Sequence, residues 1–185
     1  DKAAMFIDGR YVVQVRDQVD GNLYEYVNIK DQKPHEWLAA HASKGGTIGY
    51  DAWLHTRDWV ETAHKALKKT GAQLVEVGSN PIDSVWEDQP PRSPEKLAVH
   101  PDQYAGKSAR DKRADVAAWL KDNDYDATVI AALDSVAWFF NVRGKDIANT
   151  PVPLAYAIVR ADETATLFVA PEKLTDAVRE HLGNH

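Results

Sequence analysis

The chain has 185 residues, of which 44% are hydrophobic and 27% charged, and its formal net charge is -6. These proportions are typical of a soluble globular protein, and the length suffices for one sizeable core or two small ones. The negative charge argues against a nucleic-acid surface, which needs clustered lysines and arginines. The absence of cysteine excludes disulfides, thiolate nucleophiles and cysteine-ligated zinc. No apolar stretch approaches the roughly 18 residues that a membrane-spanning helix requires.

Strands and helices alternate along the first part of the sequence. Residues 10–19 are ambiguous, because their valines favour a strand but also fall on one face of a helix. The sequence starts at Asp1 without an initiator methionine or a signal peptide, so we expect it to begin within a longer protein. The segments with a clear pattern are predicted strands over 3–7, 22–29, 47–52 and 72–78, and predicted helices over 33–43 and 56–71.

Residues 88–101 contain four prolines, which fix φ and remove backbone donors. This stretch predicts an extended connection and a domain boundary, with one unit over 1–88 and another over 89–185. Strands and helices also alternate in the second unit. The predicted elements there are helices over 108–124, 134–141 and 171–182 and strands over 127–133, 155–161 and 165–170. The fold class predicted for both units is therefore α/β, with sheets covered on one or both faces.

Three features of the second unit are specific enough to be checked. Val116, Trp119 and Leu120 form the expected buried stripe of the first helix. Asp134 is the expected cap of the next helix, and Gly144 is the expected stop of that helix.

Metal and nucleophile motifs are weak or missing. His35 and His41 are six residues apart in "HEWLAAH", whereas a zinc-protease helix needs a spacing of four. Glu61 and His64 have a spacing known from di-iron bundles, but no second copy exists in the sequence. The sequence has no G-x-S-x-G, Walker or G-x-G-x-x-G motif. The residues alone therefore indicate neither a catalytic centre nor a bound metal.

Several stretches nevertheless match one known family in order. They are "MFIDGRYVVQVRDQVD", "WLAAHASKGGTIGYDAWLHT", "NPIDSVWEDQPPRSP", "YAGKSARDKRADVAAWL" and "LDSVAWFFNVRGKDIANTPVPLAYAIV". Together they resemble the N-terminal region of the three-domain Xaa-Pro aminopeptidases (aminopeptidase P, peptidase family M24). The last stretch is the most specific, because a helix, an Arg-Gly step, a Pro-x-Pro loop and a strand coincide in it.

The resemblance implies two creatinase-like lobes of ribonuclease-H-like fold, with mixed sheets flanked by helices. The first lobe, residues 1–88, would be incomplete at its N-terminus, and residues 89–185 would form most of the second. The catalytic "pita-bread" domain of the family, which holds two divalent metals, usually Mn²⁺, is absent from this chain. This chain would then be inactive alone, would shape the substrate cleft and would support a cytoplasmic homodimer. Its partners would be the catalytic domain and peptides with proline at the second position. The resemblance also implies that residues 10–19 are helical.

Arg10 and Arg143 are the two candidate substrate-binding residues. In the family, the arginine of "DGRY" reaches toward the cleft, and this arginine corresponds to Arg10. Its guanidinium can grip a carboxylate or a peptide carbonyl, but it can also pair with Asp8. Arg143 would lie at the end of a helix, where a cation suits the dipole.

The three consecutive aromatics Trp138, Phe139 and Phe140 cannot all face one core, so at least one should meet another helix, domain or subunit. They could also make the chain self-associate.

A second interpretation from a different class stays open. The chain could be a free-standing creatinase-like module that binds peptides or proteins without cleaving them. A small amidinohydrolase relative such as creatinase fits the "NVRG" and "NTPVP" stretch less well.

Overall fold

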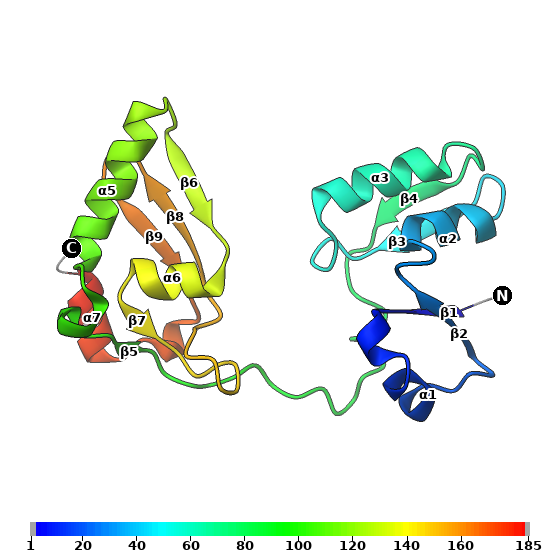
Figure 1. Cartoon of the computed structure of the whole chain (residues 1–185), viewed down its shortest axis with the longest axis horizontal. Coiled ribbons are helices and arrows are strands. Elements are labelled where there is room, and N and C mark those ends of the chain that lie inside the picture. The colour runs from blue at the N-terminus through cyan, green and yellow to red at the C-terminus, as the bar shows by residue number, and fades with distance from the viewer. Residues whose placement is uncertain (1–2, 184–185) are drawn as a thin grey trace. The chain divides into compact units, whose positions relative to one another are not determined.

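The computed structural model describes residues 3–183, and the chain divides into two compact units, unit 1 (Asp1–Gln89) and unit 2 (Pro90–His185). Unit 1 contains two small parallel sheets and the helices that flank them (Figure 1). Its elements are β1 (Ala3–Ile7), η1 (Gly9–Tyr11), α1 (Gln14–Gln18), β2 (Tyr24–Asn28), α2 (Pro34–His41), β3 (Thr47–Tyr50), α3 (Arg57–Leu67) and β4 (Gln73–Glu76).

Local signals in the sequence place most elements of unit 1. The Thr56 hydroxyl accepts a hydrogen bond from the Trp59 N–H at 3.2 Å and so caps α3, as predicted. The stripe of α3 packs on β4 through Ala63, Leu67 and Leu74, which are all buried. The resemblance implies a helix over residues 10–19, and the structure has two short helical segments there, η1 and α1, with a turn at residues 12–13 between them.

Unit 2 combines a three-stranded antiparallel sheet, in the order β6-β8-β9, with a short antiparallel pair, β5-β7. Its elements are β5 (Ala98–Val99), α4 (Asp102–Ala105), α5 (Ala109–Asp122), β6 (Ala127–Ile130), α6 (Leu133–Phe139), β7 (Val142–Arg143), β8 (Tyr156–Arg160), β9 (Ala165–Phe168), η2 (Pro171–Lys173) and α7 (Asp176–Gly183). The whole chain is therefore a mixed α/β protein.

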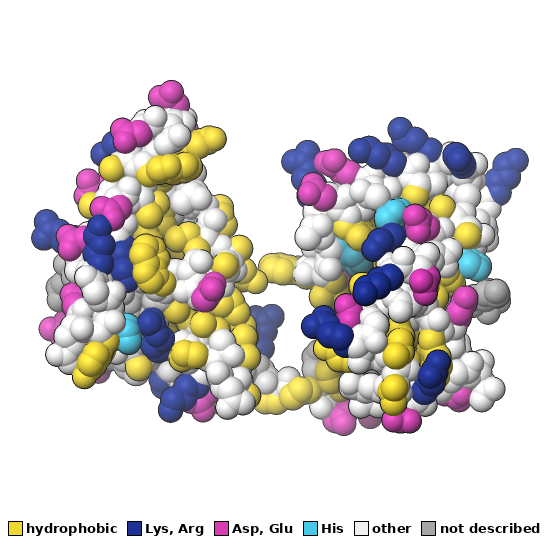
Figure 2. Space-filling view, viewed as in Figure 1, with side chains coloured by type: hydrophobic (Ala, Val, Ile, Leu, Met, Phe, Trp, Pro, Cys, Tyr) yellow, Lys and Arg dark blue, Asp and Glu magenta, His cyan; other side chains and the backbone are white. Residues whose placement is uncertain are grey.

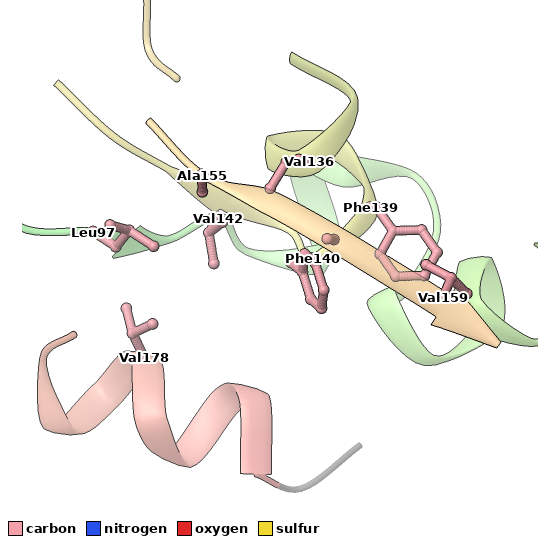
Figure 3. Close-up of a cluster of buried hydrophobic side chains, with 9 residues drawn as sticks. Leu97, Val136, Phe139, Phe140, Val142, Ala155, Val159 and Val178 are labelled. Carbon is pink, nitrogen blue, oxygen red and sulfur yellow. The ribbon is translucent and has the colours of Figure 1, made fainter. Parts of the chain in front are cut away.

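The core of unit 2 joins segments that are far apart in the sequence. Phe139 and Phe140 at the end of α6 meet Val159 of β8, and the two phenyl rings cross edge to face with centroids 4.9 Å apart (Figure 3). Val178 of α7 points toward this cluster, and Leu97, directly before β5, belongs to it as well (Figure 3). Unit 2 thus has one apolar core that includes the start and the end of its chain.

Three expectations about unit 2 are wrong in detail. Trp119 is 56% exposed and stacks on Tyr125 instead of lying in the buried stripe of α5. Asp134 lies within the first turn of α6, because Ala132 is the N-cap residue, and its carboxylate accepts the Ser135 N–H. The stop of α6 is Asn141, with φ of 49°, and not Gly144.

Gly144 has a different role from the one expected. It lies where the loop 149–155 crosses the backbone, and a Cβ added there would be 2.7 Å from the Cα and N atoms of Pro153. Among the described residues, no helix is long and apolar enough to cross a membrane.

Candidate functional site

Arg10 lies just beyond the carboxyl end of β1, in the turn that begins η1. The Asp8 carboxylate caps this turn, because its Oδ1 accepts both the backbone N–H and the Nε–H of Arg10 at 2.9 Å. The Arg10 side chain is nevertheless 79% exposed. Its Nη groups donate to none of the residues 3–183, so the outer part of the guanidinium remains available for a ligand.

The surroundings of Arg10 keep Asp8 ionised. Hydrogen bonds from the backbone and then the side chain of Arg10 lower the pKa of Asp8. Burial opposes this shift, and the charge of Lys30 adds to it more weakly. Asn28 is the last residue of β2 and Lys30 follows it. Because β2 runs parallel to β1, polar groups gather at this one edge of the sheet. The Asp8 pair therefore orients Arg10 without burying it.

A second loop cluster lies at the carboxyl edge of β3 and β4. The Asp51 carboxylate accepts the Trp53 N–H at 2.8 Å and the Asn80 Nδ2–H at 2.9 Å, which ties the two loops together. His55 contacts the Asp51 carbonyl through Nδ1 and lies over the Trp59 ring with centroids 4.0 Å apart. Trp53 itself is 92% exposed. These loops are well ordered by their own contacts, yet they present a large aromatic side chain to solvent.

Arg143 is placed differently from Arg10. It belongs to the short strand β7, and its Nη1 donates to the carbonyls of Ala137 at 3.2 Å and Val142 at 2.8 Å. One of these carbonyls lies in the last turn of α6, so the expected cation at a helix end is present although Arg143 lies outside the helix. The side chain is half-buried and its hydrogen bonds stay within the backbone of unit 2.

The three aromatics of α6 have separate environments. Phe139 and Phe140 are buried in the core of unit 2, whereas Trp138 is 52% exposed. The Nζ of Lys112 lies 4.5 Å from the centroid of the Trp138 ring, a cation–π contact. Hydrophobic side chains also gather on the face of unit 2 that Figure 2 shows.

A buried polar network next to these aromatics was missed at the level of sequence. The Lys112 Nζ donates to the Trp138 carbonyl at 2.8 Å and to the Asn141 Oδ1 at 2.5 Å. The Asn141 Nδ2 in turn donates to Asp102 and to the Lys107 carbonyl. Burial lowers the pKa of Lys112, the Arg143 charge adds to this effect, and Asp102 opposes it. No local pattern signals this network, because its members are up to 39 residues apart.

The histidines and carboxylates do not assemble into a metal centre in the part of the chain that the structure describes, residues 3–183. His41 illustrates the reason: its Nδ1 contacts the Trp37 carbonyl at 2.9 Å and its ring stacks on the Trp37 indole. A di-metal centre of the kind that the resemblance implies therefore finds no ligand set among these residues.

Comparison with known proteins defines the class of this chain. Residues 88–185 match the family described as the Creatinase/Prolidase N-terminal domain. The chain belongs to this family.

Relatives and a solved structure extend the match to nearly the full chain. It is 40% identical to the probable Xaa-Pro aminopeptidase P of Aspergillus clavatus over 98% of its own length, and 41% identical to that of Coccidioides posadasii over 99%. The crystal structure of X-prolyl aminopeptidase from Caenorhabditis elegans covers 99% of the chain with a TM-score of 0.90 and 30% identity. That protein is described as a cytosolic enzyme with a di-nuclear active site. The chain spans 28% of the two fungal relatives and 30% of the nematode chain.

Proposed function

We propose that this chain is the non-catalytic N-terminal region of a cytoplasmic Xaa-Pro aminopeptidase, which removes the residue preceding proline from the N-terminus of peptides. One observation carries the proposal: the match covers 98–99% of this chain but less than a third of relatives that bear this activity in their names.

In this proposal the two Mn²⁺ ions of the reaction belong to a catalytic domain that follows unit 2. Unit 1 is the later part of a first creatinase-like lobe, and unit 2 is the second lobe, both of ribonuclease-H-like type. Their tasks are to restrict the substrate cleft to free peptide N-termini and to support a homodimer. The ordered loops at the strand ends of unit 1 are the surfaces that best suit a shaping role.

Arg10 is the residue of this chain that best suits contact with the peptide. The Asp8 carboxylate fixes its Nε at 2.9 Å, which reduces the rotamer freedom lost on binding, while the exposed Nη groups can grip a carboxylate or carbonyl. Arg143 is the weaker candidate, because its Nη1 already donates hydrogen bonds to two backbone carbonyls.

The experiment is a kinetic comparison in the longer protein. We expect Arg10→Gln to lower kcat/KM for an Xaa-Pro peptide by about 10-fold or more, since a hydrogen bond to a charged group contributes about 1.5–3 kcal/mol. Arg16→Gln on α1 is the matched control and should leave kcat/KM unchanged. An Arg10→Gln enzyme with unaltered kcat/KM would contradict the substrate contact.

The isolated 185-residue chain tests the larger claim. Incubated with Mn²⁺ and the same peptide, it should release no amino acid, while the longer protein should do so. A reading frame that ends at His185 would instead favour the free-standing binding module, and peptide binding without cleavage would then be its signature.

A further inference from the structure

Unit 2 contains a cavity of about 500 Å³ between α5, the end of α6, the β8–β9 turn and α7. Its apolar wall includes Phe139, Phe140 and Leu167. Its charged wall consists of Arg113 from α5 and of Asp162 and Glu163 from the turn. This volume falls in the range of small-molecule sites, which are mostly apolar with a few placed polar groups.

Arg113 differs from the other cations that are buried or half-buried in unit 2. Lys112 donates to Trp138 and Asn141, Arg143 to two carbonyls, and Lys173 pairs with Asp146. Arg113 is half-buried, yet among the described residues 3–183 no hydrogen bond or ion pair involves its side chain. Because Arg113 lines the cavity, its guanidinium could pair there with an anionic group of a ligand.

The β8–β9 turn contributes negative charge to the lining of the cavity. The Oδ1 of Asp162 accepts the Thr164 hydroxyl at 2.7 Å and the Thr164 N–H at 2.9 Å, which leaves Oδ2 for a further donor. These hydrogen bonds, the hydroxyl first, lower the pKa of Asp162, so the carboxylate is ionised at neutral pH. Glu163 beside it has a φ of 69°, a left-handed conformation at the tip of the turn.

We propose that this cavity binds a free apolar α-amino acid as its zwitterion, with the carboxylate on Arg113, the ammonium on Asp162 and Glu163, and the side chain against Phe139, Phe140 and Leu167. The ligand needs both a negative and a positive group, because the cavity is lined by a cation, Arg113, and by two carboxylates, Asp162 and Glu163. The proposal does not depend on peptidase activity, since every residue involved lies in unit 2 of this chain.

Calorimetric titration of the 185-residue chain with L-leucine tests the proposal. N-acetyl-L-leucine lacks the ammonium and L-leucinamide lacks the carboxylate, so each should bind at least 10-fold more weakly than leucine. Arg113→Gln should weaken leucine binding by 10-fold or more. Arg110→Gln, on the same helix but exposed and outside the cavity, should leave it unchanged. Glu163→Gln, at an exposed turn, should weaken it several-fold, and circular dichroism checks that each variant is folded.

Three results would overturn the proposal. The first is the absence of saturable binding at leucine concentrations up to about 10 mM, beyond which affinity carries little specificity. The second is equal affinity for leucine and both blocked analogues. The third is a folded Arg113→Gln chain with unchanged affinity. If Arg113→Gln does not fold, the affinities of Arg113→Lys and Glu163→Gln for leucine, together with the affinities for the two blocked analogues, replace it as the test.

Discussion

At the scale of single residues, two buried lysines of unit 2 show how a buried charge is accommodated. Lys173 is 4% exposed and its Nζ lies 2.5 Å from the Asp146 Oδ1, while the Asp146 Oδ2 accepts the Leu154 N–H at 2.7 Å. Lys112 has no carboxylate in direct contact and instead contacts oxygens of Trp138 and Asn141. Lys173, at the end of η2, forms an ion pair with Asp146 in a loop. Lys112, in the first turn of α5, donates to a carbonyl in the last turn of α6.

Removing one member of the ion pair should be costly. We expect Lys173→Met to lower the free energy of unfolding of unit 2 by about 3–5 kcal/mol, because it leaves the Asp146 carboxylate buried without a counter-charge. Urea unfolding followed by circular dichroism measures this change. Lys145→Met, an exposed neighbour in sequence, should change stability by less than about 0.5 kcal/mol. A Lys173→Met variant as stable as this control would contradict the importance of the pair.

Acid should weaken the same pair. Burial raises the pKa of Asp146, but hydrogen bonds from Lys173, Leu154 and Ser93 outweigh burial and the pKa is lowered overall. The stabilisation is therefore fully present above the unfolded-state pKa of about 3.9 and is lost as the pH falls through the lower native value. Urea unfolding between about pH 5 and 2 should show this loss, and Asp146→Leu/Lys173→Met, which lacks both charges, should show a smaller one. If the free energy of unfolding fell equally steeply with pH in both proteins, the Asp146–Lys173 pair would not be the cause of the loss.

At the scale of elements, the loop 149–155 depends on the absence of a side chain at Gly144. A Cβ there would lie 2.8 Å from the Val152 carbonyl oxygen and closer still to Pro153, so backbone would have to move. We expect Gly144→Ala to destabilise unit 2 by about 1–3 kcal/mol, the usual cost of overpacking. Gly183→Ala, where a Cβ would meet nothing within 4 Å, is the control. Thermal unfolding that shifts equally in both variants would contradict this role of Gly144.

Helix starts could be predicted from sequence, whereas one helix end could not. Thr56 and Ser108 cap their helices through hydrogen bonds to backbone N–H groups three residues later, and such signals are local. The sequence predicts Gly144 as the stop of α6, because glycine is the usual residue at a helix end. Asn141 takes that place because its side chain bonds Asp102 and Lys112, which are remote in sequence.

The candidate site was predictable only where a motif was local. The Asp8-Gly9-Arg10 turn follows from its residues, including the pairing of Arg10 with Asp8. The cavity at Arg113 has no such signal, because it joins α5 to a hairpin some 50 residues later and nothing in the sequence shows that Arg113 lacks a partner. Burial and charge pairing are properties of the folded chain.

At the scale of the whole molecule, the stretch from Trp86 to Ser93 connects two units that each have their own hydrophobic core. Residues 90–96 belong to no helix or strand, and Arg92 is exposed. Because each unit is compact and has its own hydrophobic core, the units should survive a cut between them.

Limited trypsin digestion checks this independence. We expect early cleavage after Arg92, with products 1–92 and 93–185 that keep their helical circular dichroism signal. Arg92→Gln should remove this early product in mass spectrometry and leave slower cuts unchanged. Loss of the signal upon cleavage at Arg92 would show that the units depend on each other for folding.

The burial of Lys112 and Lys173 also protects their amines from chemical modification. At 1% and 4% exposure, neither Nζ can meet an acetylating reagent until unit 2 opens. The rate at which these two amines are acetylated therefore reports the frequency of opening, in the way that amide hydrogen exchange does for the backbone. The acetylation rates of Lys112 and Lys173 therefore measure how often unit 2 opens.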